Sequence, residues 1–308
     1  MAETKKRLQA GRKLAAKIIK DHFDRNADKI TPITGGLTNI VFEAILANNH
    51  YIVRIAKTKS KFYDFLKEQW AVKCVKKSRI PVADIIKVGR DEKGTPYMLQ
   101  EKVSGIEGPL YAHPLEIIEQ MGKLTARINS ICTTGFGNGF NWKSNKNHQK
   151  SDWKTYLMDE LRIKEKIAIL KNNKIVTPGN LKKLTATVNK VLEWKKEPAL
   201  NHGDMRIKNV IVNTKGKIVA VLDWENCTSN MAPYWDLSIA LHDLNIDEKE
   251  AFVKGYGLSP GEYLKIHDVI KMFNAIHYAH VIEELGMKKD KQALEQYRLR
   301  LNGYYDLF

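Results

Sequence analysis

The sequence predicts an α+β protein in which a small β-rich N-terminal lobe precedes a larger, mostly helical C-terminal lobe. Up to about residue 103, short runs rich in β-branched and aromatic residues alternate with helical stretches. Beyond that point, apolar residues recur mainly at the spacing of a helix face. A chain of 308 residues is long enough for one large or two modest domains. We therefore expect one domain at 1–103 and a second at 104–308.

The N-terminal lobe is expected to form a sheet with one or two helices. Leu14, Ile18 and Phe23 share one face of a helix, and Asn48-Asn49 separates two β-like runs as a hairpin turn does. The turn sequence DEKGT separates two further runs. The expected elements are helices at 8–23 and 60–78 and strands at 40–46, 51–55, 82–89 and 97–103.

The C-terminal lobe is expected to be a set of helices interrupted by one hairpin. The segment 101–108 contains two glycines and is followed by Pro109, so we place the junction of the lobes there. Residues 213–216 form the turn of the hairpin. The expected helices lie at 114–130, 151–172, 179–196, 247–256, 260–286 and 289–302, and the hairpin strands at 210–212 and 217–223.

The net charge of +16 raises the question of a nucleic-acid partner, but its distribution argues against one. Residues 141–200 carry 14 Lys and Arg against 6 Asp and Glu, whereas residues 201–308 carry 13 against 15. The lysines at 183–196 are interleaved with apolar residues at helical spacing, which is typical of a solvated helix face. No tight basic cluster with interleaved aromatic residues is present in the sequence.

Neither export nor membrane insertion is expected. Lysines interrupt every turn of the first 20 residues, and no run approaches the roughly 20 apolar residues of a membrane span. Cys74, Cys132 and Cys227 are far apart and lack the spacing of metal ligands. Free thiols without an export signal fit a reducing compartment, so we expect a cytoplasmic protein.

The segment LNHGDMRIKN at 200–209 carries the strongest chemical signal. A His-x-Asp unit precedes an Asn by five residues, directly before an apolar strand, and the next strand ends in Asp223. Phosphoryl transfer requires a group that orients the acceptor hydroxyl, together with oxygen ligands for Mg²⁺. Asp204, Asn209 and Asp223 supply these groups.

These residues, together with LDWE at 222–225 and PYWDL at 233–237, resemble the aminoglycoside phosphotransferase and choline kinase superfamily. The resemblance covers nearly the whole chain. It implies a bilobal protein-kinase-like fold and transfer of the γ-phosphoryl group of ATP to a hydroxyl. It further implies that Asp204 is the catalytic base, that Asn209 and Asp223 bind Mg²⁺, and that His202 and Asp236 support the catalytic loop.

The nucleotide site is expected in the N-terminal lobe. TGGLTN at 34–39 precedes a strand, where backbone N–H groups of a glycine loop can approach phosphates. Gly35, Gly36, Thr38 and Asn39 are therefore candidate nucleotide contacts, although a Gly-Gly pair is also common in simple turns.

Arg54 is a second candidate because strand alternation places it on the same face as Ile52 and Ala56. A charge there must be paired or must contact an anion. In the resembled family, a basic residue on this strand binds the nucleotide phosphates. Glu68 in the next helix is the expected partner, with Asp64 as an alternative.

Gln100 and Lys102 lie in the segment expected to be the hinge, whose backbone pairs with adenine in the resembled family. Because side chains need not be specific there, ATP and GTP are not distinguished.

A small-molecule acceptor is expected because only 13 positions separate Asp223 from Asp236, which leaves no room for a long activation loop. The acidic balance after residue 200 suggests a cationic acceptor, with Glu225, Glu283 and Glu284 as candidate contacts. An amine-bearing, aminoglycoside-like compound is the leading expectation. The alternatives are choline or another amino alcohol, a sugar kinase of the same fold, and a non-catalytic pseudokinase.

His277 and His280 are three residues apart on an expected helix, close to the spacing of a metal pair. No third ligand accompanies them, so packing or a polar contact is the preferred interpretation.

Overall fold

The computed structural model describes residues 2–33, 39–141, 144, 146–147 and 152–306. These residues form two compact units, which are described separately. The first unit draws on Met1–Glu107, Phe140–Lys146 and Val210–Glu225, and the second on Gly108–Gly139, Asn147–Asn209 and Asn226–Phe308. Three segments that were expected in the C-terminal domain therefore belong to the first unit, namely 104–107, 140–146 and 210–225.

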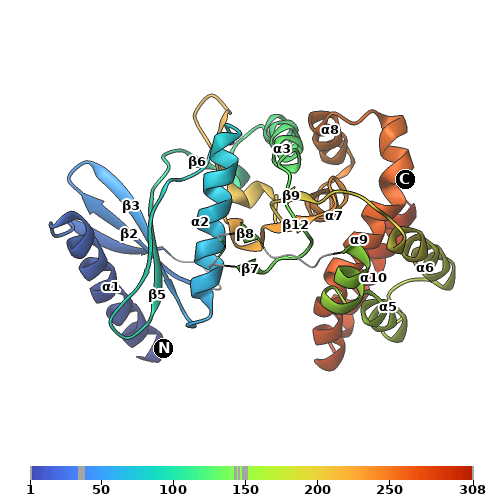
Figure 1. Cartoon of the computed structure of the whole chain (residues 1–308), viewed down its shortest axis with the longest axis horizontal. Helices are drawn as coiled ribbons and strands as arrows, with labels where there is room; N and C mark the ends of the chain where they lie inside the picture. The colour runs from blue at the N-terminus through green and yellow to red at the C-terminus, as the bar shows by residue number, and fades with distance from the viewer. Residues whose placement is uncertain (1, 34–38, 142–143, 145, 148–151, 307–308) are drawn as a thin grey trace. The chain divides into compact units, whose positions relative to one another are not determined.

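The first unit contains a five-stranded antiparallel sheet in the order β1-β2-β3-β5-β4. Figure 1 labels β2, β3 and β5 of this sheet. The edge strand β1 was not expected from the sequence, because Pro32 interrupts its pattern, but an edge position tolerates a missing N–H. The strands are β1 (Lys29–Ile33), β2 (Asn39–Leu46), β3 (Asn49–Ala56), β4 (Ile85–Arg90) and β5 (Pro96–Glu101).

Two helices, α1 (Ala2–Phe23) and α2 (Lys61–Lys77), pack on opposite faces of this sheet. Val53 and Ile55 of β3 belong to the core that includes Ile18 of α1. Arg54 lies between them in sequence and therefore points to the other face, where its guanidinium is 5.5 Å from the ring of Phe65 in α2. The alternation of β3 thus places one charged side chain on the α2 face of the sheet.

The hairpin expected near residues 210–223 also forms in the first unit. β10 (Val210–Val212) pairs with β11 (Ile218–Val221) and, on its other side, with β6 (Ile106–Glu107). Asn213 closes the turn, because its side-chain oxygen accepts hydrogen bonds from the backbone N–H groups of Lys215 and Lys217. The remaining short elements are β7 (Phe140–Asn141), β8 (Lys146–Asn147) and the turn η4 (Trp224–Asn226).

The second unit is mostly helical and is built around the long helix α9, which contacts α5, α6, α7 and α10. Helix α9 begins with a capping box between Ser259 and Glu262. The helices are α3 (Pro114–Asn129), α4 (Trp153–Thr155), α5 (Ile163–Asn172), α6 (Pro178–Leu192), α7 (Tyr234–Ala240), α8 (Ile246–Tyr256), α9 (Pro260–Met287) and α10 (Lys291–Asp306). The short elements are η1 (Gly108–Leu110), η2 (Tyr156–Glu160), η3 (Ile207–Asn209) and the paired strands β9 (Ala199–Asn201) and β12 (Thr228–Asn230).

Helices α3 and α8 cross in close contact, as Figure 1 shows at the upper right of centre. A Cβ on Gly122 would lie 2.1 Å from the carbonyl oxygen of Phe252, and one on Gly255 would lie 2.0 Å from that of Glu119. Only glycine at both positions permits this backbone approach.

The single helix expected at 151–172 is broken in the structure. The segment is divided into α4, the π-helical turn η2 and α5. Arg162 separates η2 from α5 with a left-handed φ of 54°. No Gly or Pro marks this break, so helical periodicity alone did not reveal it.

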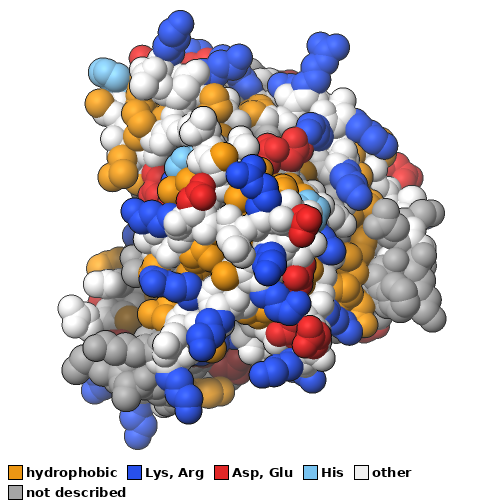
Figure 2. Space-filling model, turned by 90° about the vertical axis from the view of Figure 1, so that its left-hand side faces the viewer, with side chains coloured by type: hydrophobic (Ala, Val, Ile, Leu, Met, Phe, Trp, Pro, Cys, Tyr) orange, Lys and Arg blue, Asp and Glu red, His pale blue; other side chains and the backbone are white. Residues whose placement is uncertain are grey.

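Lys and Arg side chains are scattered over the face of the molecule shown in Figure 2, with hydrophobic and acidic side chains between them. On this face they do not form one continuous basic patch. None of the described helices combines the length and apolar composition that a membrane span requires.

Candidate active site

Residues 202–209, the Asp204 loop, are held in the second unit by a buried carboxylate. Asp236 is fully buried at the start of α7 and accepts hydrogen bonds from the backbone N–H groups of His202 at 3.0 Å and Gly203 at 2.8 Å. It also accepts one from Asn129 Nδ2 at 2.9 Å. A single carboxylate therefore satisfies three buried donors and fixes the start of the loop.

Gly203 makes the tight backbone path before Asp204 possible. Its φ is +79°, and a Cβ at this position would lie 2.1 Å from the carbonyl oxygen of Asn226. Both the left-handed conformation and the close approach require glycine.

Asp204 is only 8% exposed, and its side chain has neighbours on several sides. Asn209 Nδ2 donates to Asp204 Oδ2 at 3.0 Å and to the Asp204 carbonyl oxygen at 2.8 Å. Arg206 Nε lies 2.9 Å from Asp204 Oδ1, and Lys208 Nζ lies 3.2 Å from Oδ2. The loop therefore presents one carboxylate in a defined orientation.

Arg206 is itself positioned by residues of the second unit. Its Nη2 donates to the hydroxyl oxygen of Tyr278 at 2.9 Å, and its Nη1 lies 3.5 Å from Asp243 Oδ2. His242 stacks on the Tyr278 ring with a centroid separation of 3.9 Å. Burial raises the pKa of the Tyr278 hydroxyl, so it remains protonated at neutral pH.

A cavity of about 570 Å³ opens beside Asp204, with all its lining residues in the second unit. Its lining mixes charged, polar and aromatic side chains, as expected of a site for a polar small molecule. The lining residues are Asn138, Tyr156, Glu160, Leu161, Lys166, Gly203, Asp204, Arg206, Lys208, Asn226, Thr228, Trp235, His277 and His280.

His277 and His280, the histidine pair noted in the sequence, both line this cavity. The Nδ1–H of His280 donates to the carbonyl oxygen of His277 at 2.8 Å. Burial, helped by the charge of His280, lowers the pKa of His277 to about 3, so His277 is neutral at pH 7. The Trp235 ring packs against His277 with centroids 5.9 Å apart.

Sequence reasoning did not identify several residues of the lining. Trp235 directly precedes Asp236 in the PYWDL motif, and this adjacency could have signalled its position. Glu160 and Lys166 carry no comparable signal, because only the broken helix at 151–172 brings them to the cavity.

In the first unit, Arg54 lies among three carboxylates. Its Nη1 donates to Glu68 Oε1 at 2.6 Å, and its Nη2 lies 3.7 Å from Asp223 Oδ1 and 3.8 Å from Glu225 Oε2. The expected alternative partner, Asp64, pairs instead with a lysine of its own helix.

Burial and ion pairing act in opposite directions on this cluster. Burial alone would lower the pKa of Arg54, but Glu68 and Asp223 outweigh it and raise that pKa. The Glu68 carboxyl is more deeply buried, and burial raises its pKa despite the charge of Arg54. Asp223 adopts a left-handed φ of 62° and is the most exposed of the three carboxylates.

The other residues expected at the nucleotide site are spread over the first unit, and three of them lie outside the described residues. Gln100 pairs with Ile52 in the sheet and lies near Glu68 and Asp223 around a small hollow. Lys102 follows β5 and forms an ion pair with a glutamate of β2 at 2.8 Å. Asn39 is the buried first residue of β2, whereas Gly35, Gly36 and Thr38 lie outside the described residues.

The three carboxylates expected to bind the acceptor do not line the cavity beside Asp204. Glu225 belongs to the first unit, where Lys61 lies 3.3 Å from it. Glu283 and Glu284 lie on α9 and are exposed, and Glu284 pairs with Lys288 at 3.6 Å. The expectation of a cationic acceptor therefore gains no support from these residues.

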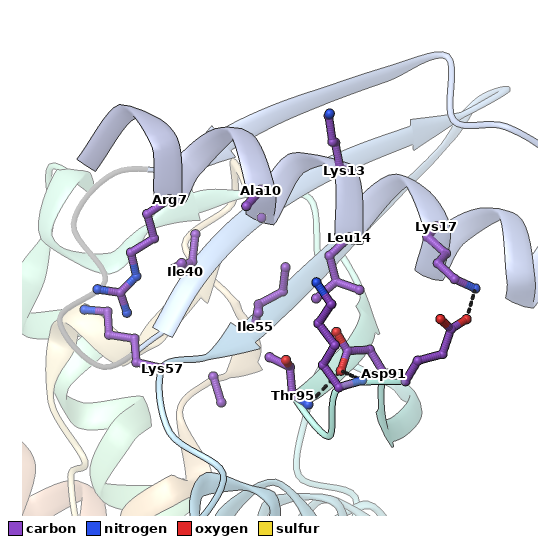
Figure 3. A pocket seen from close by; sticks show the side chains of 14 residues that line it. Arg7, Ala10, Lys13, Leu14, Lys17, Ile40, Ile55, Lys57, Asp91 and Thr95 are labelled. Carbon is purple, nitrogen blue, oxygen red and sulfur yellow. Dashed lines mark hydrogen bonds and ion pairs between the residues drawn. The ribbon is translucent and has the colours of Figure 1, made fainter. Parts of the chain in front are cut away.

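A second cavity, of about 460 Å³, lies between α1 and the sheet of the first unit (Figure 3). Leu14, Ile40 and Ile55 form part of its floor, and lysines stand at its edge. Ile55 follows Arg54 in β3 and so faces the opposite side of the sheet. This cavity is therefore separate from the Arg54 cluster.

Comparison with known proteins places the chain in a family. The model of the phosphotransferase enzyme family (APH) matches residues 29–268, more than half of the chain. The chain belongs to this family. The phosphotransferase is also 32% identical over 122 residues to the "uncharacterized protein in ileS 3′ region" of Staphylococcus aureus, an alignment that spans 38% of this chain and 87% of that protein.

Solved structures establish the fold of the phosphotransferase. The apo form of a thermostable mutant of aminoglycoside phosphotransferase APH(4)-Ia matches with a TM-score of 0.69 and 13% identity, over 94% of this chain and 97% of that one. The ternary complex of a further variant of this mutant with AMP-PNP and hygromycin B gives the same values. The GDP and kanamycin complex of APH(2″)-IIia matches with a TM-score of 0.63 and 11% identity, over the same shares of the two chains. The predicted protein-kinase-like α+β fold and the predicted resemblance are both confirmed.

Asn209 of the second unit and Asp223 of the first each have an oxygen atom to which a cation could bind. Both hydrogen bonds of the Asn209 side-chain amide use Nδ2, which leaves its Oδ1 available to a cation. The Asp223 side chain is 37% exposed and keeps a carboxylate accessible. Among the described residues, no group of three or more His, Cys, Asp or Glu side chains forms a metal cluster. Mg²⁺ suits such sparse sites because it often takes one or two carboxylates together with substrate phosphates.

Proposed function

We propose that this phosphotransferase transfers the γ-phosphoryl group of ATP to a hydroxyl of a small molecule, with Asp204 as the catalytic base. The observation that carries the proposal is the Asp204 carboxylate, fixed by Asn209 and open to the cavity beside it. Asp204 accepts the hydroxyl proton as the acceptor oxygen bonds to phosphorus and the bond from phosphorus to ADP breaks. A cytoplasmic location remains part of this proposal, supported by the sequence features given above.

The nucleotide and magnesium assignments extend the proposal. Arg54 binds the phosphates, and Asn209 and Asp223 hold Mg²⁺, which supplies positive charge to the transferring group. Asn209 belongs to the second unit and Asp223 to the first, so their common role is supported by the sequence motif. Similar structures bind AMP-PNP or GDP, and these findings favour ATP as donor with GTP as the alternative.

The decisive experiment replaces Asp204 by Asn. Removing the base is expected to lower kcat by about 10²- to 10⁴-fold, while the Kd for Mg-ATP stays within about twofold, because Asp204 acts on the acceptor rather than on ATP. Asp247→Asn is the matched control, since this exposed carboxylate of α8 does not line the cavity. Near-normal turnover of Asp204→Asn would rule out the assigned base.

A pseudokinase predicts a different result from the same assays. It would bind Mg-ATP but transfer no phosphate to any member of an acceptor screen.

The charge of the acceptor separates the remaining candidate substrates. Hygromycin B and kanamycin bound to similar structures favour an amine-bearing compound, whereas the lining of the cavity favours an anionic one.

A further inference from the structure

The charged side chains around the cavity beside Asp204 are not those expected for a cationic acceptor. Three cations, Lys166, Arg206 and Lys208, line it together with only two carboxylates, Asp204 and Glu160. The contacts of each charged group determine which charge a ligand meets.

Asp204 is already compensated by its neighbours. Arg206 lies 2.9 Å from one carboxylate oxygen and Lys208 lies 3.2 Å from the other. A carboxylate with two cations in contact gives little net attraction for an amine. Asp204 can still accept a proton from a hydroxyl, because each oxygen carries more than one lone pair.

Glu160, the second carboxylate, is held against the loop that precedes β7. Its Oε1 accepts a hydrogen bond from the backbone N–H of Asn138 at 3.3 Å. A Cβ on Gly137 would lie only 2.7 Å from the same oxygen, which shows how closely the loop covers it. Glu160 therefore already has a backbone partner.

Lys166 differs from the other charged groups of the lining. Within the described part of the chain its side-chain ammonium has neither a hydrogen bond nor an ion pair, and the side chain is partly buried. Burial lowers its pKa, and the charge of Arg162 acts in the same direction. A partly desolvated ammonium without a partner is costly in the free protein and gains most from an incoming anion.

We propose that the acceptor carries an oxyanion, either a carboxylate or a phosphate ester, which Lys166 binds while the reacting hydroxyl lies at Asp204. The proposal rests on the phosphotransferase function and specifies its substrate class. Trp235 and the neutral His277 offer a flat surface to the uncharged body of such a molecule. A polycationic acceptor would place an amine in the field of Lys166, and Glu160 is the one carboxylate of the described lining that has no cation in contact with it.

The test compares four hydroxylated probes of similar size: glucuronate, glucose 1-phosphate, glucose and glucosamine. Their dissociation constants are measured by ligand-observed NMR on the full chain in the presence of Mg²⁺ and AMP-PNP, which occupies the nucleotide site. Glucuronate and glucose 1-phosphate are expected to bind about 10- to 100-fold more tightly than glucose, as a charge-assisted hydrogen bond provides. The two anions distinguish a carboxylate site from a phosphate site. Equal or undetectable binding of both anions, or tighter binding of glucosamine, overturns the proposal.

Variants assign the preference to Lys166. Lys166→Gln is expected to abolish the advantage of the anions over glucose, and Lys166→Glu to reverse it in favour of glucosamine. Lys164→Gln is the matched control, because it removes the same charge from the exposed face of α5 and is expected to change each Kd by less than about twofold. An anion preference that persists in both Lys166 variants also overturns the assignment.

The outcomes separate this inference from the proposed function. Transfer of phosphate to glucose or glucosamine in preference to the anions refutes the oxyanion site but leaves the kinase function standing. Tight binding of the anions without phosphate transfer to any acceptor supports the oxyanion site but refutes the kinase function.

Discussion

The contribution of the ion pair between Arg54 and Glu68 to the stability of the first unit can be tested quantitatively. The two side chains meet at 2.6 Å, and only 12% of the Arg54 side chain and 4% of the Glu68 side chain are exposed. At a charge separation of about 4 Å and an effective dielectric constant of about 20, their attraction is about 4 kcal/mol. Arg54→Met leaves Glu68 buried without its cation, so we expect the free energy of unfolding to fall by about 3 kcal/mol at pH 8.

A double-mutant cycle isolates this interaction. Arg54→Met, Glu68→Gln and the double variant are compared by urea denaturation followed by circular dichroism. The double variant should lose about 2 kcal/mol less than the sum of the single losses. The half-exposed pair Lys17–Asp21 on α1 is the control, and its coupling should stay near 0.3–0.5 kcal/mol.

The pH dependence of the Arg54→Met variant provides a second check. Without Arg54, the pKa of the folded-state Glu68 carboxyl rises further above its unfolded value. A raised pKa favours the folded state at low pH and penalises it as pH increases, so the loss should be smaller at pH 5 than at pH 8. A coupling no larger than that of the α1 control, or an equal loss at both pH values, would refute the reasoning.

Three further predictions follow from the second unit. Because the pKa of His277 is about 3 in the folded state, this group should lower the free energy of unfolding by about 2 kcal/mol as the pH falls from 8 to 5. Thermal denaturation should therefore show a smaller loss of stability over this pH range for His277→Gln than for the native protein. An equal loss in both proteins would contradict the prediction. Asp236→Asn should lower the free energy of unfolding by about 2–4 kcal/mol, because one amide oxygen cannot serve three buried donors, and a urea midpoint like that of the native protein would exclude this. Tyr278→Phe removes the hydroxyl that accepts from Arg206 and should reduce kcat about 3- to 10-fold with little change in the KM for ATP; steady-state kinetics with unchanged kcat would exclude a positioning role.

Local sequence signals predicted many of the elements. Apolar periodicity located α2, α3, α6 and α9, and β-branched runs located the hairpin of β2 and β3, because these segments bury one face against a core. The strand β1 escaped notice because Pro32 disrupts its pattern, and the break at Arg162 because a left-handed non-glycine residue leaves no sequence signal.

The site residues that belong to motifs of the resembled family were predictable, including some that are far apart in sequence, such as His202 and Asp236. Asp204 and Asn209 are five residues apart, and a short motif identified both. Lys166, Trp235 and His277 come from three separate segments and meet only through the packing of α5, α7 and α9. A pattern read along the chain cannot find such a set, and the expected acceptor contacts Glu225, Glu283 and Glu284 do not line the cavity.

The composition of the first unit has a consequence for synthesis of the protein. The five-stranded sheet is complete at Glu101, but β6 pairs with β10, and Arg54 pairs with Asp223 and Glu225. β10, Asp223 and Glu225 are all translated more than a hundred residues after β6 and Arg54. At about 5–20 residues per second, the ribosome needs on the order of 10 s to supply them. During this interval, the nascent chain exposes an unpaired edge of β6 and carries an Arg54–Glu68 pair that lacks its other two carboxylates. A chaperone that binds nascent chains should therefore associate most strongly with ribosomes stalled between residues 107 and 210.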